Sequence, residues 1–320
     1  MVIFNIDDGF KIENNWEKNT FKCWIVAESA EIKNIPYSFS TECIKECLDY
    51  NQQQRIDYYN NYIFILIGIL EQQNKQIKSK EMNIFLGKDF IITVYKSPIK
   101  ILEELIRDIK EDKNCHLLKE IREPSIILYY ILDRIIVKNY NIISELETRG
   151  DKIELDILKE PHKEQLNALL FIRRETYKLR KLLKPLRYIG DVILLNENGV
   201  ISEEAIIFFR AISKKLEKLM ISLDNLSQEL ALVREAYESE IANKTNELMK
   251  VFTIITAIFL PLELITAIFS MNFSYMPFKE YVAGFYAIIL LLTCVTIILL
   301  VIFKHKRILW QYDSSIIKLI

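Results

Sequence analysis

Two long apolar segments near the C-terminal end constrain this chain more than any other feature. Residues 251–271 hold a single charged residue, Glu263, and residues 282–303 hold none. Each segment matches the ~20 apolar residues that a helix needs to cross a hydrocarbon core about 30 Å thick. The second segment has no polar face, which disfavours the alternative of a buried helical hairpin in a soluble protein. We therefore expect two transmembrane helices within 251–303, joined by a short external loop at 272–281.

Positive charges flank the two segments on their outer sides. They lie at Lys244, Lys250, Lys304, Lys306 and Arg307, whereas the intervening loop carries only Lys279 and Glu280. Because basic residues near spans stay on the cytoplasmic side, both ends of the chain are expected in the cytoplasm. This predicts a multi-pass protein of the plasma (inner) membrane with a basic cytosolic tail at 304–320. The first residues include acids and no long apolar run, so no signal peptide is expected.

Composition excludes several classes of function. Lysine and arginine total 42 against 43 acidic residues, so no global positive charge favours nucleic-acid binding. The five cysteines are scattered, which argues against a disulfide scaffold. Cys43 and Cys47 lie one helical turn apart, as in a soft-metal site, but no third ligand is near. No phosphate-binding loop, nucleophile elbow or zinc-protease motif is present, so we expect neither an enzyme nor a bound cofactor.

The part of the chain before the apolar segments divides into two regions. Strand-like runs concentrate in the first hundred residues, which predicts an α+β cytosolic domain over 1–124. Apolar residues then recur at helical spacing, which predicts a helical region over 125–250. Two of its helices are expected to end near prolines: 125–158 before Pro161, and 163–183 before Pro185.

One very long helix is expected from about residue 201. Ser202 is a suitable N-cap, and two glutamates follow it in the first turn. Apolar residues then step by three and four, which is typical of helices that pack side by side over a long distance: Phe209, Ile212, Leu216, Leu219, Leu223, Leu226, Leu230, Val233, Tyr237 and Ile241. About seventy residues at 1.5 Å each would reach ~105 Å, so we expect a stalk that continues unbroken into the first span.

The same spacing continues into the first span and places two of its threonines and its single carboxylate on one stripe: Asn246, Met249, Thr253, Thr256, Leu260, Glu263 and Ala267. Ionisable residues inside a membrane usually face a bundle interior or a water-filled path. The alternative is that the stripe is only a helix-packing surface. One stripe per chain cannot enclose a pore. A conduction path would therefore require a symmetric ring of chains with the first span inside.

The run MKVFTIITAIFLPLELITAIFSMNFSYMP at 249–277 resembles the CorA family of magnesium transporters. Further similar segments are spread over the chain in the same order, at 81–95, 127–140, 179–187 and 243–250. The resemblance implies a funnel-shaped homopentamer with an α+β cytosolic domain, a long helical stalk and two C-terminal transmembrane helices. It also implies passive Mg²⁺ uptake driven by the membrane potential, with Mg²⁺ as both substrate and regulator.

The resemblance also assigns residues to the ion path. Ser270, Met271 and Asn272 occupy the selectivity mouth, where the family has Gly-Met-Asn and the asparagine meets hydrated Mg²⁺. A ring of amide oxygens suits that ion, because Mg²⁺ gives up its water shell reluctantly and its waters donate hydrogen bonds. Met249, Phe252 and Leu260 would form a hydrophobic constriction that gates by dewetting, or would only pack helices together.

Three positions depart from the family pattern. Ser270 replaces a glycine and lacks its backbone freedom. Glu263 stands where a neutral polar residue is more usual. In a ring its carboxylates cannot all stay ionised without a cation among them, which predicts a metal site, unless Glu263 points between subunits and bonds a threonine. Glu46 looks like one half of a regulatory Mg²⁺ site between subunits, but Ala211 stands where the partner acid is expected.

The sequence thus favours a channel that takes up Mg²⁺, and with it Co²⁺ or Ni²⁺. Two alternatives stay open. Glu263 is compatible with a zinc or broader transition-metal transporter of the same family. Ser270 is compatible with a non-conducting relative that serves as a membrane-anchored scaffold or regulatory subunit. The expected partners are further copies of the chain, the lipid bilayer and divalent cations.

Overall fold

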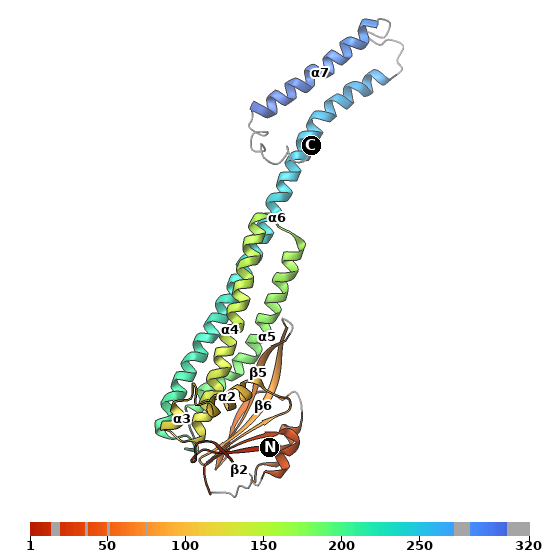
Figure 1. The fold of residues 1–320 in the computed structure, drawn as a ribbon. Coiled ribbons are helices and arrows are strands. Elements are labelled where there is room, and N and C mark those ends of the chain that lie inside the picture. Colours follow the sequence, from red (N-terminus) through yellow and green to blue (C-terminus); the bar gives the residue numbers. More distant parts are fainter. Residues whose placement is uncertain (14–19, 36–37, 50–51, 74–75, 272–281, 306–320) are drawn as a thin grey trace. The chain divides into compact units, whose positions relative to one another are not determined.

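The computed structural model describes residues 1–13, 20–35, 38–49, 52–73, 76–271 and 282–305 (Figure 1). The chain divides into two compact units, an N-terminal unit Met1–Tyr237 and a C-terminal unit Glu238–Ile320. The longest helix, α6, spans Glu203–Ser270 and therefore contributes to both units.

A seven-stranded sheet forms the core of the N-terminal unit. Its strands lie in the order β2-β1-β3-β7-β6-β5-β4. All neighbours are antiparallel except β3 and β7, which run parallel with Trp24 opposite Ile91. The strands are β1 (Val2–Asn5), β2 (Lys11–Glu13), β3 (Cys23–Glu28), β4 (Arg55–Tyr58), β5 (Tyr62–Gln73), β6 (Gln76–Gly87) and β7 (Phe90–Tyr95). The strand pair expected within 81–95 is the hairpin of β6 and β7.

Both faces of the sheet are covered, because alternate residues of its central strands enter two different apolar cores. Along β5, Ile63, Ile65 and Ile67 join one core, whereas Phe64 and Leu66 join the other. A strand that is buried on both faces reads as a continuous apolar run, which explains the sequence YIFILIGIL. The smaller core lies under a 3-10 turn η1 (Ser29–Asn34) and helix α1 (Thr41–Leu48).

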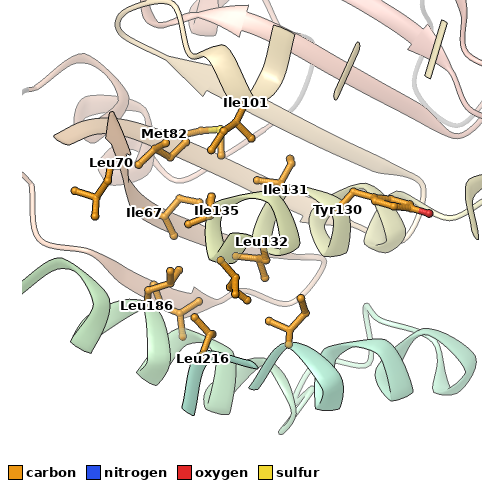
Figure 2. Close-up of a cluster of buried hydrophobic side chains, with 14 of the residues drawn as sticks. Ile67, Leu70, Met82, Ile101, Tyr130, Ile131, Leu132, Ile135, Leu186 and Leu216 are labelled. Carbon is orange, nitrogen blue, oxygen red and sulfur yellow. The ribbon is translucent and has the colours of Figure 1, made fainter. Parts of the chain in front are cut away.

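The larger core joins the other face of the sheet to the remaining helices of the unit. These are α2 (Lys100–Lys110), α3 (Leu117–Glu120), α4 (Pro124–Lys159), α5 (Lys163–Ile193) and the first half of α6. Figure 2 shows one layer of this core, in which side chains from the sheet, α4, α5 and α6 meet: Ile67, Met82, Leu132, Ile135, Leu186 and Leu216. This packing anchors the start of α6 in the N-terminal unit.

Helix α5 does not end before Pro185 as the sequence suggested; it continues to Ile193. Proline removes one backbone N–H and costs a helix about 3 kcal/mol. Beyond the proline, Leu186, Ile189 and Ile193 are all buried, and each buried side chain of this kind contributes roughly 1.5–3 kcal/mol. The Gln54 side-chain amide also donates to the backbone oxygen of Leu182 at 3.2 Å, just before the proline. The free energy gained by burying these side chains therefore outweighs the cost of Pro185 to the helix.

The start of α6 and its seam as far as Val233 agree with the sequence. Beyond it Tyr237 is only half-buried and Ile241 is exposed, because the N-terminal unit ends at Tyr237. The Ser202 hydroxyl accepts a hydrogen bond from the Ala205 amide at 3.2 Å, which caps the helix. The buried residues of α6 are Ala205, Phe209, Ile212, Leu216, Leu219, Leu223, Leu226, Leu230 and Val233. At 1.5 Å per residue, the 68 residues of α6 extend over ~100 Å.

The C-terminal unit holds the second half of α6 and helix α7 (Val282–His305). Both helices contain stretches long and apolar enough to cross a membrane, with mean hydropathies of 2.2 in α6 and 3.0 over Gly284–Phe303. Large apolar side chains such as Phe252, Phe259 and Leu290 are exposed along both helices. Such exposure is the expected state of a surface whose solvent is lipid.

Candidate cation pathway

The stripe predicted on the first span lies on α6 and is here called the α6 stripe: Asn246, Met249, Thr253, Thr256, Leu260, Glu263 and Ala267. The side chains of α6 that are partly shielded repeat on one face, at Val251, Ile254, Ile258, Ile265 and Phe269. All seven members of the α6 stripe are exposed instead. The structure therefore leaves the predicted pathway residues accessible in the single chain, although α7 borders the stripe at Phe303 and beside Glu263.

The two threonines of the α6 stripe present only hydrogen-bond acceptors to their surroundings. The Thr253 hydroxyl donates its hydrogen to the Met249 backbone oxygen at 2.7 Å, and the Thr256 hydroxyl donates to the Phe252 oxygen at 2.8 Å. With those hydrogens used, the oxygen lone pairs remain for other partners. The waters around a metal cation point their hydrogens outward, so acceptor-rich surfaces suit a hydrated cation better than an anion.

Glu263 is the member of the α6 stripe that borders a cavity shared with the second span. Its side chain is exposed, and the cavity, of about 410 Å³, is also lined by Thr293 and Thr296 of α7. Both of these threonine hydroxyls already donate to backbone oxygens of α7. They can therefore offer Glu263 only lone pairs, which do not stabilise an ionised carboxylate. A cation or water on the stripe side is the better partner.

Three large apolar side chains lie on or beside the α6 stripe, where the sequence predicted a constriction. Met249, Phe252 and Leu260 are each at least 60% exposed in the single chain. Side chains of this size would meet around a symmetry axis and exclude water between them. The sequence assigned them this role or that of packing helices together, and the structure leaves all three side chains mostly exposed in the single chain.

The first span ends at Ser270 without glycine. The Ser270 hydroxyl donates to the Ala267 oxygen at 2.8 Å, and the Met271 amide donates to the Ile268 oxygen at 3.2 Å. These short-range bonds satisfy carbonyls of the last helical turn. Serine is thus compatible with a regular helix end. Asn272 and the rest of the loop to 281 lie outside the described residues, as does the tail from 306.

The N-terminal unit holds the expected regulatory residue Glu46 on α1, with its side chain 11% exposed. Arg55 of β4 approaches both carboxylate oxygens of Glu46 at 2.5 Å through one terminal nitrogen, Nη2. Its Nε donates to Asp57 at 2.6 Å. Although burial opposes the charge, these hydrogen bonds raise the pKa of Arg55 further above its usual range. Sequence analysis missed Arg55, although its i, i+2 spacing from Asp57 places both on one face of a strand.

Other candidate metal ligands are not brought together. Across the described residues, no group of three or more histidine, cysteine or acidic side chains is arranged to hold a metal ion. Cys43 and Cys47 are buried, and burial raises the pKa of the Cys47 thiol to about 12. A thiol that stays protonated is a poor metal ligand, which removes the reason to regard this pair as a soft-metal site.

A family model described as "CorA-like Mg2+ transporter protein" matches residues 23–307. The chain belongs to the CorA family. It is therefore a divalent-cation transporter with two C-terminal transmembrane helices rather than an enzyme. This confirms the family resemblance, the α/β N-terminal domain and the long stalk helix.

Individual CorA-family proteins are similar over most of this chain. The cobalt/magnesium transport protein CorA of Thermotoga maritima is 24% identical over 266 residues, covering 82% of this chain and 75% of that protein. The complete structure of the CorA magnesium transporter from Methanocaldococcus jannaschii aligns with a TM-score of 0.82 at 19% identity, covering 95% and 96% of the two chains. The cytoplasmic domain of ZntB from Vibrio parahaemolyticus aligns over 76% of this chain and 98% of its own, with a TM-score of 0.65 at 10% identity.

Proposed function

We propose that this chain forms a homopentameric channel through which Mg²⁺ enters the cell, driven by the membrane potential. The observation that carries the proposal is the exposed α6 stripe, whose threonines and Glu263 present acceptors to a hydrated cation. A single stripe becomes a pathway only when several copies face one axis. Names of CorA-family relatives, which include cobalt and magnesium transport, support this class of substrate.

The proposal assigns parts of the chain to parts of the channel. The outer mouth is formed by Ser270, Met271 and Asn272, with the asparagine amide oxygens binding the hydrated ion. Below it, Glu263 forms a ring that holds a cation, and Met249, Phe252 and Leu260 form the gate. The regions are a cytosolic domain at 1–124, a helical region at 125–250 with the stalk from about 201, the spans at 251–303 and a cytosolic tail at 304–320.

Flux into liposomes tests the function. Purified protein reconstituted under an inside-negative potential should take up Mg²⁺, and separate assays with Co²⁺, Ni²⁺ and Zn²⁺ should rank the competing ions. Native mass spectrometry should give about five times the chain mass of 37.9 kDa. A stable pentamer with no divalent flux would favour a non-conducting scaffold.

A mouth variant tests the assigned site within the same assay. Asn272→Ala removes the amide oxygens that accept hydrogen bonds from the hydrated ion, so Mg²⁺ flux should fall about tenfold or more while the pentamer persists. Asn167→Ala, at an exposed asparagine of α5 in the N-terminal unit, is the matched control and should conduct normally. Wild-type flux in the mouth variant would show that another group selects the ion.

A second candidate function is transport of Zn²⁺ or other transition metals. Glu263 favours it, because a carboxylate replaces ion-bound water more readily than a neutral side chain does, and Zn²⁺ accepts direct carboxylate ligands. Zn²⁺ flux that exceeds Mg²⁺ flux at equal concentration would support this second function over the first.

A further inference from the structure

The carboxylate of Glu46 is already paired with a cationic side chain, that of Arg55. The guanidinium of Arg55 contacts both carboxylate oxygens of Glu46 at 2.5 Å and reaches Asp57 at 2.6 Å. It also lies 5.8 Å from the centre of the Phe64 ring, an aromatic contact that favours a positive charge. Arg55 on β4 therefore bonds to Glu46 of α1 and Asp57 of β4, and it lies beside the ring of Phe64 on β5.

This arrangement leaves no room for a second cation at the same oxygens. Mg²⁺ binds carboxylate oxygens directly or through its tightly held waters, and either mode needs space and accessible lone pairs. Arg55 takes one lone pair on each oxygen of a Glu46 side chain that is only 11% exposed. A divalent ion placed there would also lie within a few ångströms of the guanidinium charge and be repelled by it. The residues present therefore do not fit the regulatory Mg²⁺ site that the family resemblance suggested.

The position on α6 where the family pattern has the partner acid does not supply a metal ligand either. On α6 the sequence at that position is Phe209, Arg210, Ala211, and both Arg210 and Ala211 are exposed. An exposed arginine beside an alanine offers a positive charge and no carboxylate oxygen. Both halves of the expected site are thus unsuited to a metal ion, one because Arg55 occupies it and the other because its acid is absent.

We infer that Arg55 is the permanent counter-ion of Glu46 and stands where the resemblance would place a regulatory Mg²⁺, so that internal Mg²⁺ does not act through Glu46. The inference rests on the proposed function only where regulation of flux is concerned. Whether Mg²⁺ binds at Glu46 can be tested without any measurement of transport. It also has a positive consequence: without the guanidinium, Glu46 and Asp57 become two neighbouring carboxylates able to bind a divalent cation.

The test compares Mg²⁺ responses of the full chain in detergent and in liposomes. The variants are Glu46→Gln, Arg55→Gln, the double variant, and Lys215→Gln as a control that breaks the Lys215–Asp133 ion pair elsewhere in the N-terminal unit. Melting temperature is measured against Mg²⁺ concentration, and flux is measured against internal Mg²⁺. The melting data decide the inference even if no flux is found.

The Mg²⁺ concentration that gives half of the maximal change in melting temperature should be the same in wild type, Glu46→Gln and Lys215→Gln. In Arg55→Gln, the melting temperature should rise with Mg²⁺ at concentrations about tenfold lower than in wild type, and the double variant should lose this response. Arg55→Lys, which keeps the charge, should behave as wild type. The inference is overturned if Glu46→Gln alone shifts the wild-type response about fivefold or more, or if folded Arg55→Gln gains no response.

Discussion

Among single residues, Glu263 gives the most direct test of the proposed cation pathway. Glu263→Gln keeps the shape of the side chain and removes its charge, so a cation in the pore loses its only ionised ligand from the span. We expect apparent divalent affinity to fall about tenfold, since hydrogen bonds or contacts to charged groups contribute roughly 1.5–3 kcal/mol each. Flux measured against cation concentration checks this, with Glu217→Gln, an exposed acid of α6 in the N-terminal unit, as the control. Unchanged affinity and ion ranking would make Glu263 a structural residue.

A second acid, Glu147, bears on stability rather than transport. It borders a cavity of about 260 Å³ between α4 and α6 that Asp151, Glu154 and Glu229 also line. Burial raises the pKa of Glu147, and the negative charges of Glu229 and Asp151 raise it further. The folded state therefore disfavours the ionised form, and this costs stability as the pH rises above the ordinary value of 4.5.

Glu147→Gln should accordingly raise the melting temperature at pH 7, and the gain should shrink as the pH falls towards 4.5 and be lost below it. Melting curves of the full chain across this pH range measure it. Glu217→Gln, at an exposed acid of α6 that does not border this cavity, is the control. A gain that stays constant down to low pH would show that the effect does not come from ionisation.

At the scale of elements, the buried seam of α6 holds the start of the stalk in the N-terminal unit. Leu223 is fully buried among α4, α5 and α6, whereas Leu155 at the far part of α4 is 59% exposed. Leu223→Ala should lower the free energy of unfolding by about 2–5 kcal/mol, because it leaves a cavity. Leu155→Ala should change it by less than about 0.5 kcal/mol. Denaturant titration of both variants compares them directly, and equal effects would contradict the assigned packing.

Element prediction from sequence succeeded where a pattern is local and repeats. The seam of α6 follows from apolar residues three and four apart, and burial of Phe209 through Val233 confirms that spacing. The two spans follow from two long apolar segments. Pro185 was misjudged, because its local cost is outweighed by burial against the sheet and by Gln54, far away in sequence. Arg55 was missed for a similar reason: its pairing with Glu46 depends on how α1 packs beside β4.

At the scale of the whole molecule, the flanking charges predict that both ends face the cytoplasm. A fluorescent reporter that matures only in the cytoplasm should be active when fused after residue 320. A reporter that requires an oxidising compartment should be active when inserted within 272–281, and inactive at the terminus. The reverse pattern would overturn the orientation and, with it, the direction of Mg²⁺ entry.

The single parallel pairing in the sheet sets an order in which the N-terminal unit can be completed. Strands β4 to β7 are consecutive antiparallel neighbours, so their contacts close short loops and form early. Strands β1 to β3 form a second local set, in which β1 pairs antiparallel with β2 and with β3. The two sets meet only where β3 pairs with β7, from Cys23 opposite Phe90 to Glu28 opposite Tyr95. During synthesis, the free edge of β3 must therefore wait until residue 95 has left the ribosome. The earliest strands to be made are the last to join the rest of the sheet.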